Sequence, residues 1–173
     1  SYPSDRLIKV SLIAAEYALK VDHADIASRM VERPLWPTIW PGEHYKLLTA
    51  LTEVLQPKLV IEIGTATGYS ALAIKKKLMP NARLVSFDVV SWKDFPNCVL
   101  KQQDFESGQL EQVLADLTEP SVFEKYRGLL AKADFVFIDA AKDGVQEKKF
   151  IKNFETVKFL GKPIFMFDDI RLM

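Results

Sequence analysis

The chain has 173 residues, of which 49% are hydrophobic and 27% are charged, and its 23 basic and 23 acidic side chains leave no formal net charge. This length predicts one domain, and this composition excludes intrinsic disorder as the main state. The balanced charge argues against a strongly basic nucleic-acid-binding protein, and no apolar run reaches the ~18 residues that a membrane-spanning helix needs.

The N-terminal part is predicted to be helical and to end in an aromatic loop. We expect helices over residues 5–20, with Ser4 or Asp5 as the N-cap, and over residues 24–32. Residues 33–42 contain three prolines, which favour an extended loop, and helical spacing returns over residues 43–55. We therefore interpret residues 1–41 as a helical cap with an aromatic loop, and residues 42–173 as the core of the same domain.

From residue 59 onward, short apolar runs alternate with helical patterns. The runs predict strands at 59–63, 83–88, 98–101, 134–139 and 163–168. The helical patterns lie at 69–78, 106–117, 120–132 and 147–160. This alternation is typical of a doubly wound, Rossmann-like α/β fold, in which a mostly parallel sheet carries helices on both faces.

Acidic residues stand at the ends of all the predicted strands. They are Glu62, Asp88, Asp104, Asp139, Asp168 and Asp169. A single acid at such a position can simply cap the following helix. Because ligands of parallel sheets bind at the carboxyl ends of the strands, acids at every end favour a binding site there.

The turn after the first predicted strand contains two glycines. Gly64 allows a sharp turn out of the strand, and Gly68 allows backbone or ligand to approach the start of the next helix, where free N–H groups suit an anionic ligand. A dinucleotide fingerprint would have glycine where Ala66 and Tyr69 stand, and no phosphate-binding Gly-Lys-Ser/Thr follows, so a nicotinamide oxidoreductase is disfavoured. Asp88, at the end of the second predicted strand, can accept both hydroxyls of a ribose.

Residues 62–70 read Glu-x-Gly-x-x-x-Gly-x-Ser, which resembles the first motif of class I S-adenosylmethionine-dependent methyltransferases in their metal-dependent catechol and caffeoyl-CoA O-methyltransferase branch. The segment Asp139-Ala-Ala-Lys142-Asp143 and the pair Asp168-Asp169 resemble later motifs of that branch. The resemblance covers roughly residues 42–170. It implies an enzyme that transfers the methyl group of S-adenosylmethionine to a hydroxyl of a small molecule, such as a phenol or a sugar.

The resemblance also implies roles for individual residues. Asp139, Asp168 and Asp169 would bind a divalent cation, with Mg²⁺ as the first choice, and Lys142 would take the proton of the substrate hydroxyl. The residues expected to contact the cofactor are Glu62, Gly64, Thr65, Gly68, Tyr69, Ser70, Asp88, Asp104, Phe105 and Asp139. The chemistry agrees, because three converging carboxylates repel one another unless a cation joins them, and oxygen ligands suit Mg²⁺, Mn²⁺ or Ca²⁺.

Two departures of the chain from the family pattern bear on its function. Only residues 89–97 separate the second and third predicted strands, which is too short for the usual crossover helix. The sequence given ends directly after the fifth predicted strand, so we expect a sheet without the family's C-terminal antiparallel pair. Both departures keep a second function open, namely a non-catalytic S-adenosylmethionine-binding module that acts through interactions.

Several other residues receive a plainer interpretation. Trp36 and Trp40 either close over a substrate or pack the N-terminal helices, and His44 is interpreted as a helix-end residue. Cys98 reads as a core residue, and a lone cysteine fits a reducing, cytoplasmic location because it cannot form an internal disulfide. The exposed sheet edge makes a homodimer one option, while no nucleic-acid or membrane partner is predicted.

Overall fold

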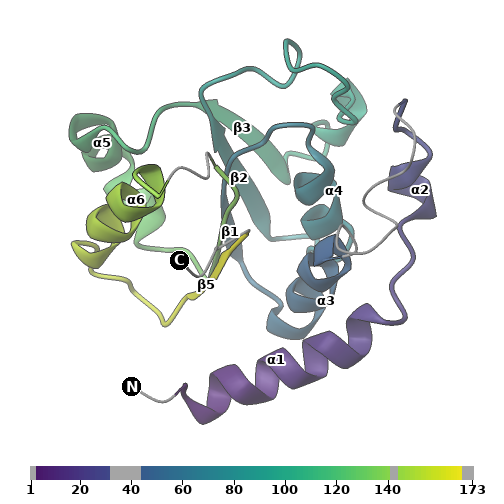
Figure 1. The fold of residues 1–173 in the computed structure, drawn as a ribbon, viewed down its shortest axis with the longest axis horizontal. Helices are drawn as coiled ribbons and strands as arrows, with labels where there is room; N and C mark the ends of the chain where they lie inside the picture. Colours follow the sequence, from purple (N-terminus) through teal and green to yellow (C-terminus); the bar gives the residue numbers. More distant parts are fainter. Residues whose placement is uncertain (1–2, 32–43, 141–143, 169–173) are drawn as a thin grey trace.

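The computed structural model describes residues 3–31, 44–140 and 144–168, and it contains one five-stranded sheet (Figure 1). Its strands are β1 (Leu59–Ile63), β2 (Arg83–Asp88), β3 (Leu110–Leu114), β4 (Phe135–Ile138) and β5 (Ile164–Phe167). The strand order is β3-β2-β1-β4-β5, and all neighbouring pairs are parallel. The predicted doubly wound α/β fold is confirmed, and the described residues contain no antiparallel strand pair.

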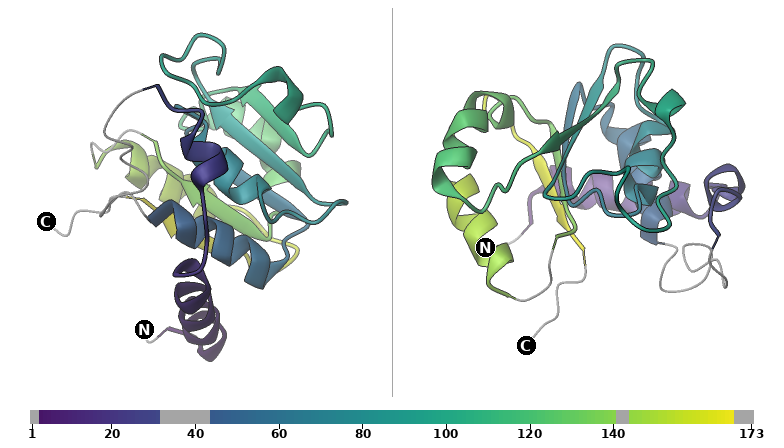
Figure 2. Two further views of the ribbon diagram at one scale, coloured as in Figure 1. Left: turned by 90° about the vertical axis from the view of Figure 1, so that its right-hand side faces the viewer. Right: turned by 90° about the horizontal axis from the view of Figure 1, so that it is seen from above.

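Helices cover both faces of this sheet. They are α1 (Asp5–Ala18), α2 (Ala24–Ala27), α3 (Tyr45–Leu55), α4 (Tyr69–Lys75), the short 3-10 helix η3 (Gln102–Asp104), α5 (Pro120–Leu130) and α6 (Gln146–Glu155). Viewed along the sheet, α3 and α4 lie on one side of it and α5 and α6 on the other (Figure 2).

Two separate apolar cores follow from this layering. Alternate residues of each strand point to opposite faces, so Val60 packs with α3 and α4, while Ile61 and Ile63 pack with α5 and α6. All five residues of β1 are buried, as expected for the central strand of a sheet covered on both sides. The rigid centre of the domain is therefore the strand that leads into the glycine-containing turn.

The third strand is not where the sequence pattern predicted it. The prediction of a strand at 98–101 and a helix at 106–117 was wrong, because β3 is Leu110–Leu114. The apolar residues of this segment recur at the spacing of a helix face, although the segment is a half-exposed edge strand. They are Leu110, Val113, Leu114 and Leu117, and their spacing led to the prediction of a helix. The crossover from β2 to β3 therefore runs from residue 89 to residue 109, so the expectation of an unusually short crossover was also wrong.

At the N-terminus, α1 lies along the outside of the molecule beside α3 (Figure 1). The side chain of Ser4 caps α1 by accepting a hydrogen bond from the N–H of Leu7, as predicted. The predicted aromatic loop with Trp36 and Trp40 lies outside the described residues. Within the parts of the chain that the structure describes, no helix is long and apolar enough to cross a membrane.

Candidate functional site at the carboxyl edge of the sheet

The turn between β1 and α4 depends on its glycines. Gly64 and Gly68 have φ angles of +100° and +80°, and even Ala66 has a positive φ, of 42°. A Cβ atom on Gly64 would lie 2.0 Å from the carbonyl oxygen of Asp139, and one on Gly68 would lie 2.3 Å from the side chain of Leu100. Gly64 therefore allows the ends of β1 and β4 to touch, which draws residues of both strands into one site.

Asp88, at the end of β2, holds this turn in place. Its Oδ2 accepts hydrogen bonds from the backbone N–H groups of Thr65 (2.7 Å) and Ala66 (3.0 Å), and its Oδ1 accepts one from Val90 (2.9 Å). The sequence predicted that hydroxyl groups of a ligand would meet this carboxylate. Each carboxylate oxygen has two lone pairs, so Asp88 can hold the turn and still accept a hydroxyl donor.

A buried carboxylate lies under the turn. The hydroxyl of Ser86 donates a 2.5 Å hydrogen bond to Glu62, and it also lies 2.7 Å from the hydroxyl of Thr65. The amide of Gln112 on β3 donates to that same Thr65 hydroxyl over 3.0 Å. Burial raises the pKa of Glu62 to about 7, against the opposing hydrogen bonds from Ser70 and Ser86.

Tyr69 and Ser70, the first residues of α4, point into the protein. Tyr69 is buried, and its ring lies against Tyr45 (5.3 Å between centroids) and His23 (5.6 Å). Ser70 is also buried. A ligand in the turn would therefore meet the backbone of these two residues and not their side chains.

Asp139 and Asp168 follow the neighbouring strands β4 and β5 and stand at the same edge of the sheet. The hydroxyl of Tyr45 donates a 3.4 Å hydrogen bond to Asp139, and Nε2 of His44 lies 3.3 Å from Oδ2 of Asp168. His44 is thus the helix-end residue of α3 that the sequence predicted, and it also faces an acid of the site.

The structure describes two of the three acids of the predicted metal site, Asp139 and Asp168. Lys142 and Asp169 lie outside the described residues, so their predicted roles stay predictions. Within residues 3–31, 44–140 and 144–168, no group of three or more His, Cys, Asp or Glu side chains is arranged to hold a metal ion. The two described acids, Asp139 and Asp168, are oxygen donors on adjacent strand ends, and such donors fit Mg²⁺.

A cavity of about 350 Å³ opens beside these acids. It is lined from four strand ends and from α6, and its polar lining includes Gly64, Asp88, Asp116, Asp139 and Gln146. Asp116 was missed by the sequence analysis, although it follows an apolar run directly, because that run was interpreted as a helix. With β3 placed correctly, Asp116 stands two residues past its end, as other acids of the edge follow their strands.

Asp104 and Phe105, predicted to border the cofactor, are not among the residues that line this cavity. The prediction depended on the wrongly placed third strand. Asp104 is buried near η3, where its Oδ2 lies 2.7 Å from Arg29 and accepts a 2.7 Å hydrogen bond from the N–H of Lys101. Phe105 stacks on Trp92. Both residues anchor the β2–β3 crossover to the body of the domain.

We expect Asp104→Ala to lower the free energy of unfolding by about 2 kcal/mol, because it strands the partly buried guanidinium of Arg29. The affinity for the cofactor that the sequence resemblance predicts, measured with S-adenosylhomocysteine, should stay within about twofold of the parent at a temperature where the variant is folded. Urea unfolding and calorimetry measure the two quantities. A tenfold or greater loss of affinity with unchanged stability would restore the original interpretation of Asp104 as a cofactor contact.

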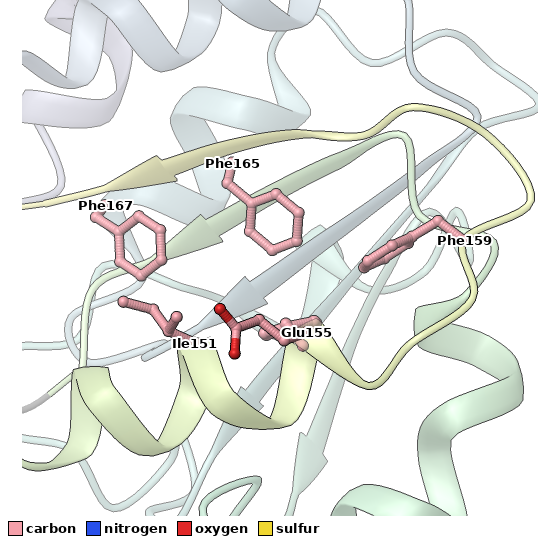
Figure 3. Close-up of a pocket in the computed structure, with 6 residues that line it drawn as sticks. Ile151, Glu155, Phe159, Phe165 and Phe167 are labelled. Carbon is pink, nitrogen blue, oxygen red and sulfur yellow. The ribbon is translucent and has the colours of Figure 1, made fainter. Parts of the chain in front are cut away.

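A second cavity, of about 250 Å³, lies between α6 and β5 (Figure 3). Its lining residues are Ile151, Phe154, Glu155, Phe159, Phe165 and Phe167. Five of these six side chains are apolar, so the lining of this cavity differs from the acidic edge described above. It lacks the hydrogen-bonding groups that orient a polar ligand, so we do not assign it as the functional site.

Known proteins match this chain in sequence and in fold. A family model described as O-methyltransferase matches residues 24–162. The O-methyltransferase TomG of Streptomyces achromogenes, solved with S-adenosylmethionine, is 22% identical, with a TM-score of 0.49, and the match covers 90% of this chain but only 62% of TomG.

Two further structures share the fold more closely. The methyltransferase PaMTH1 of Podospora anserina, solved with S-adenosylhomocysteine, is 17% identical with a TM-score of 0.58, and the match covers 97% of this chain and 72% of PaMTH1. A protein of Staphylococcus aureus with the provisional name caffeoyl-CoA O-methyltransferase is 21% identical with a TM-score of 0.62, and the match covers 93% of this chain and 73% of that protein.

Proposed function

Since the chain belongs to the O-methyltransferase family, we propose that it binds S-adenosylmethionine at the acidic edge of the sheet and transfers the methyl group to a hydroxyl of a small molecule. One observation carries this proposal. Gly64, Asp88 and Asp139 come from three different strand ends and line a single cavity of about 350 Å³. A nucleoside with a positively charged amino-acid tail suits an acidic cavity at the carboxyl ends of parallel strands.

The described residues suggest how the cofactor is held. We assign Asp88 to a ribose hydroxyl, and Asp116, after the neighbouring strand β3, to the adenine side of the cavity. We assign the amino-acid tail to the turn that contains Gly64 and Ala66, because both residues line the same cavity as Asp88. Glu62, buried beneath the turn, is ionised more readily when a cationic group lies nearby.

The proposed chemistry is a displacement at the methyl carbon. S-adenosylmethionine supplies an electrophilic methyl group on a sulfonium; the carbon–sulfur bond breaks with its electron pair on sulfur as the carbon–oxygen bond forms. We assign the proton of the acceptor hydroxyl to the Nζ of Lys142. The remaining contribution of the protein is to align the two reactants and to exclude water.

We also propose that Asp139, Asp168 and Asp169 hold a divalent cation, with Mg²⁺ the best fit to an all-oxygen set. Support comes from the parallel pairing of β4 and β5, which brings Asp139 and Asp168 to one edge. A bound cation lowers the pKa of a coordinated hydroxyl and orients it. The cytoplasmic location inferred from the lone Cys98 belongs to the same proposal.

Calorimetry with S-adenosylhomocysteine tests the cofactor site. We expect binding, and we expect Asp88→Asn to weaken it at least about tenfold, because the variant loses the charged acceptor for a ribose hydroxyl. Gly128→Ala, on the exposed surface of α5, is the matched control and should bind like the parent. No binding at millimolar ligand would contradict the proposal.

The same titration with and without MgCl₂ tests the cation site. Asp168→Asn should remove the effect of Mg²⁺ while leaving metal-free binding unchanged, since Asp168 does not line the cavity. Methyl transfer to a panel of phenols and sugars then tests the reaction itself. Cofactor binding with no metal response and no transfer to any acceptor would favour the non-catalytic module instead.

A further inference from the structure

A row of polar side chains crosses three neighbouring strands beneath the turn between β1 and α4. Ser86 on β2 pairs in register with Glu62 on β1 and with Gln112 on β3. Directly paired residues of neighbouring strands point to the same face of the sheet, so these three side chains lie next to one another. Glu62 and Ser86 are buried, and Gln112 is half-buried on the edge strand. Polar groups in such a place need hydrogen-bond partners.

The hydroxyl of Thr65, in the turn itself, completes the row as a chain of hydrogen bonds. Ser86 donates its single hydroxyl proton to Glu62 (2.5 Å), so it is the acceptor in its 2.7 Å contact with Thr65. Thr65 therefore donates its own proton to Ser86 and accepts an amide proton of Gln112 over 3.0 Å. The chain runs in one direction, from the amide of Gln112 to the carboxylate of Glu62, and hydrogen bonds aligned in this way strengthen one another.

The rest of the Gln112 amide holds the segment that follows β2. Its Nε2 also donates to the carbonyl of Val90 (3.1 Å), and its Oε1 accepts from the backbone N–H of Trp92 (2.9 Å). Turning the amide over would set its oxygen against the carbonyl oxygen of Val90, so only one orientation satisfies all of these contacts. The side chain of Gln112 therefore joins the turn at Thr65 to residues 90–92.

The two segments that Gln112 joins form neighbouring parts of the wall of the acidic cavity. The turn contributes Gly64 and Ala66 to the lining of about 350 Å³, and the end of β2 contributes Asp88 together with the next residue, Val89. Gln112 itself is not among the lining residues. It can therefore act on a ligand only through the residues that it holds.

Building on the proposed function, we propose that Gln112 is a positioning residue for S-adenosylmethionine, which fixes the turn and the end of β2 at the separation that the cofactor spans. In that function the turn takes the amino-acid tail and Asp88 takes a ribose hydroxyl. Asp88 joins the same segments by accepting from Thr65 and Val90, but it must also accept from the ligand. Gln112 joins them without using a group that the ligand needs. A wall that is fixed in advance spares a ligand that touches both parts the cost of ordering them.

The binding of a whole ligand and of half of it tests the proposal. Gln112→Met keeps a long, unbranched side chain but removes every hydrogen bond of the amide. The variant should weaken S-adenosylhomocysteine, which spans both segments, about tenfold, and adenosine, which meets one of them, by less than about threefold. Calorimetry and NMR titration measure the two affinities at a temperature where the variant is folded.

Gln109→Met is the matched control, because it makes the same change just before β3. The amide of Gln109 donates to the carbonyl of Met79 (2.8 Å), and neither residue lines the cavity, so this variant should bind both ligands like the parent. Equal weakening of both ligands by Gln112→Met would overturn the proposal, because the loss would then not depend on aligning two parts of the wall. Parental affinity of that variant for both ligands would overturn it as well and would leave the proposed function intact.

Hydrogen exchange of the ligand-free chain tests the hold on the wall directly. In Gln112→Met the backbone N–H of Trp92 loses its acceptor, and the segments of Thr65 and Val90 are released, so these three amides should exchange at least about tenfold faster. The N–H of Asp134, bonded to the carbonyl of Leu59 at the other end of the sheet (2.9 Å), should keep its parental rate. A parent that binds no cofactor contradicts the proposed function, whereas unchanged exchange at the three amides overturns the role of Gln112 whether or not the cofactor binds.

Discussion

Replacing Gly64 by alanine is expected to destabilise the domain by about 4 kcal/mol or more. The new Cβ would stand 2.0 Å from the carbonyl oxygen of Asp139, which is backbone and cannot rotate away. The φ angle of +100° adds strain for any residue with a side chain. Both costs fall on the contact between the ends of β1 and β4, so the acidic cavity should be lost together with stability.

Gly128→Ala is the matched control, because it adds the same methyl group to another glycine. Gly128 lies in α5, and a Cβ there meets nothing within 4 Å. This variant should be as stable as the parent or more stable by up to about 1 kcal/mol, since alanine favours helix. Urea unfolding followed by circular dichroism measures both variants. A Gly64→Ala protein within about 1 kcal/mol of the parent would contradict the close contact.

Two buried titratable side chains are expected to make the stability of the domain depend on pH in opposite directions. Burial lowers the pKa of His23 to about 4, and the charges of Lys76 and Lys46 add to this against those of Asp25 and Asp22. The unfolded chain therefore binds the additional proton between pH 4 and 6.5, so this contribution to stability rises with pH and is lost on acidification.

Glu62 acts the other way. Its pKa of about 7 in the folded chain exceeds the value of 4.5 for a free side chain, so the folded state retains a proton that the unfolded state has released. Its contribution to stability is complete below pH 4.5 and is lost as the pH rises toward 7. Each of the two side chains changes the free energy of unfolding by about 3 kcal/mol at most. Over the pH range in which both titrate, their opposite contributions largely cancel.

Single neutral substitutions should uncover the two opposed slopes. Relative to the parent, Glu62→Gln should gain stability as the pH rises from 4.5 to 7, because the destabilising group is gone. His23→Gln should lose relative stability as the pH rises from 4 to 6.5, because the stabilising trend is gone. Urea titrations in EDTA at several pH values measure both differences. Parallel curves for parent and variants would show that neither group is shifted.

The positions of the strands along the chain could be predicted from the sequence wherever a strand is fully buried. β4 consists of apolar residues only, and β1 is apolar except for Glu62, so both runs predict a buried strand. β3 is different, because it is an edge strand with a mixed burial pattern, and its leucines and valine happen to repeat at helical intervals. Only the pairing with β2 decides between the two interpretations, and pairing is not visible along one chain.

The site shows the same division. Glu62 and Asp88 lie in the last residues of buried strands, and Gly64 and Asp139 directly follow such strands. Their approximate position was therefore predictable from the rule that ligands bind at carboxyl strand ends. Asp104 was predicted at the site but does not line the cavity, whereas Asp116, which was not predicted, does, and both differences come from the one misplaced strand. Asp88 accepts hydrogen bonds from the turn because of the positive φ angles at Gly64 and Ala66. Backbone angles of this kind cannot be predicted from the spacing of residues in the sequence.

The central position of β1 has a consequence for the order in which the chain folds. β1 pairs with β2 only 24 residues later in the chain, but with β4 75 residues later, as in the pairs Leu59–Arg83 and Val60–Phe135. The local pairing closes a short loop and forms early, whereas the distant pairing must wait for a long loop to close. We therefore expect the wall of the acidic cavity formed by β4 to form after the wall formed by β2, and we expect a ligand that contacts both walls to slow unfolding without accelerating folding.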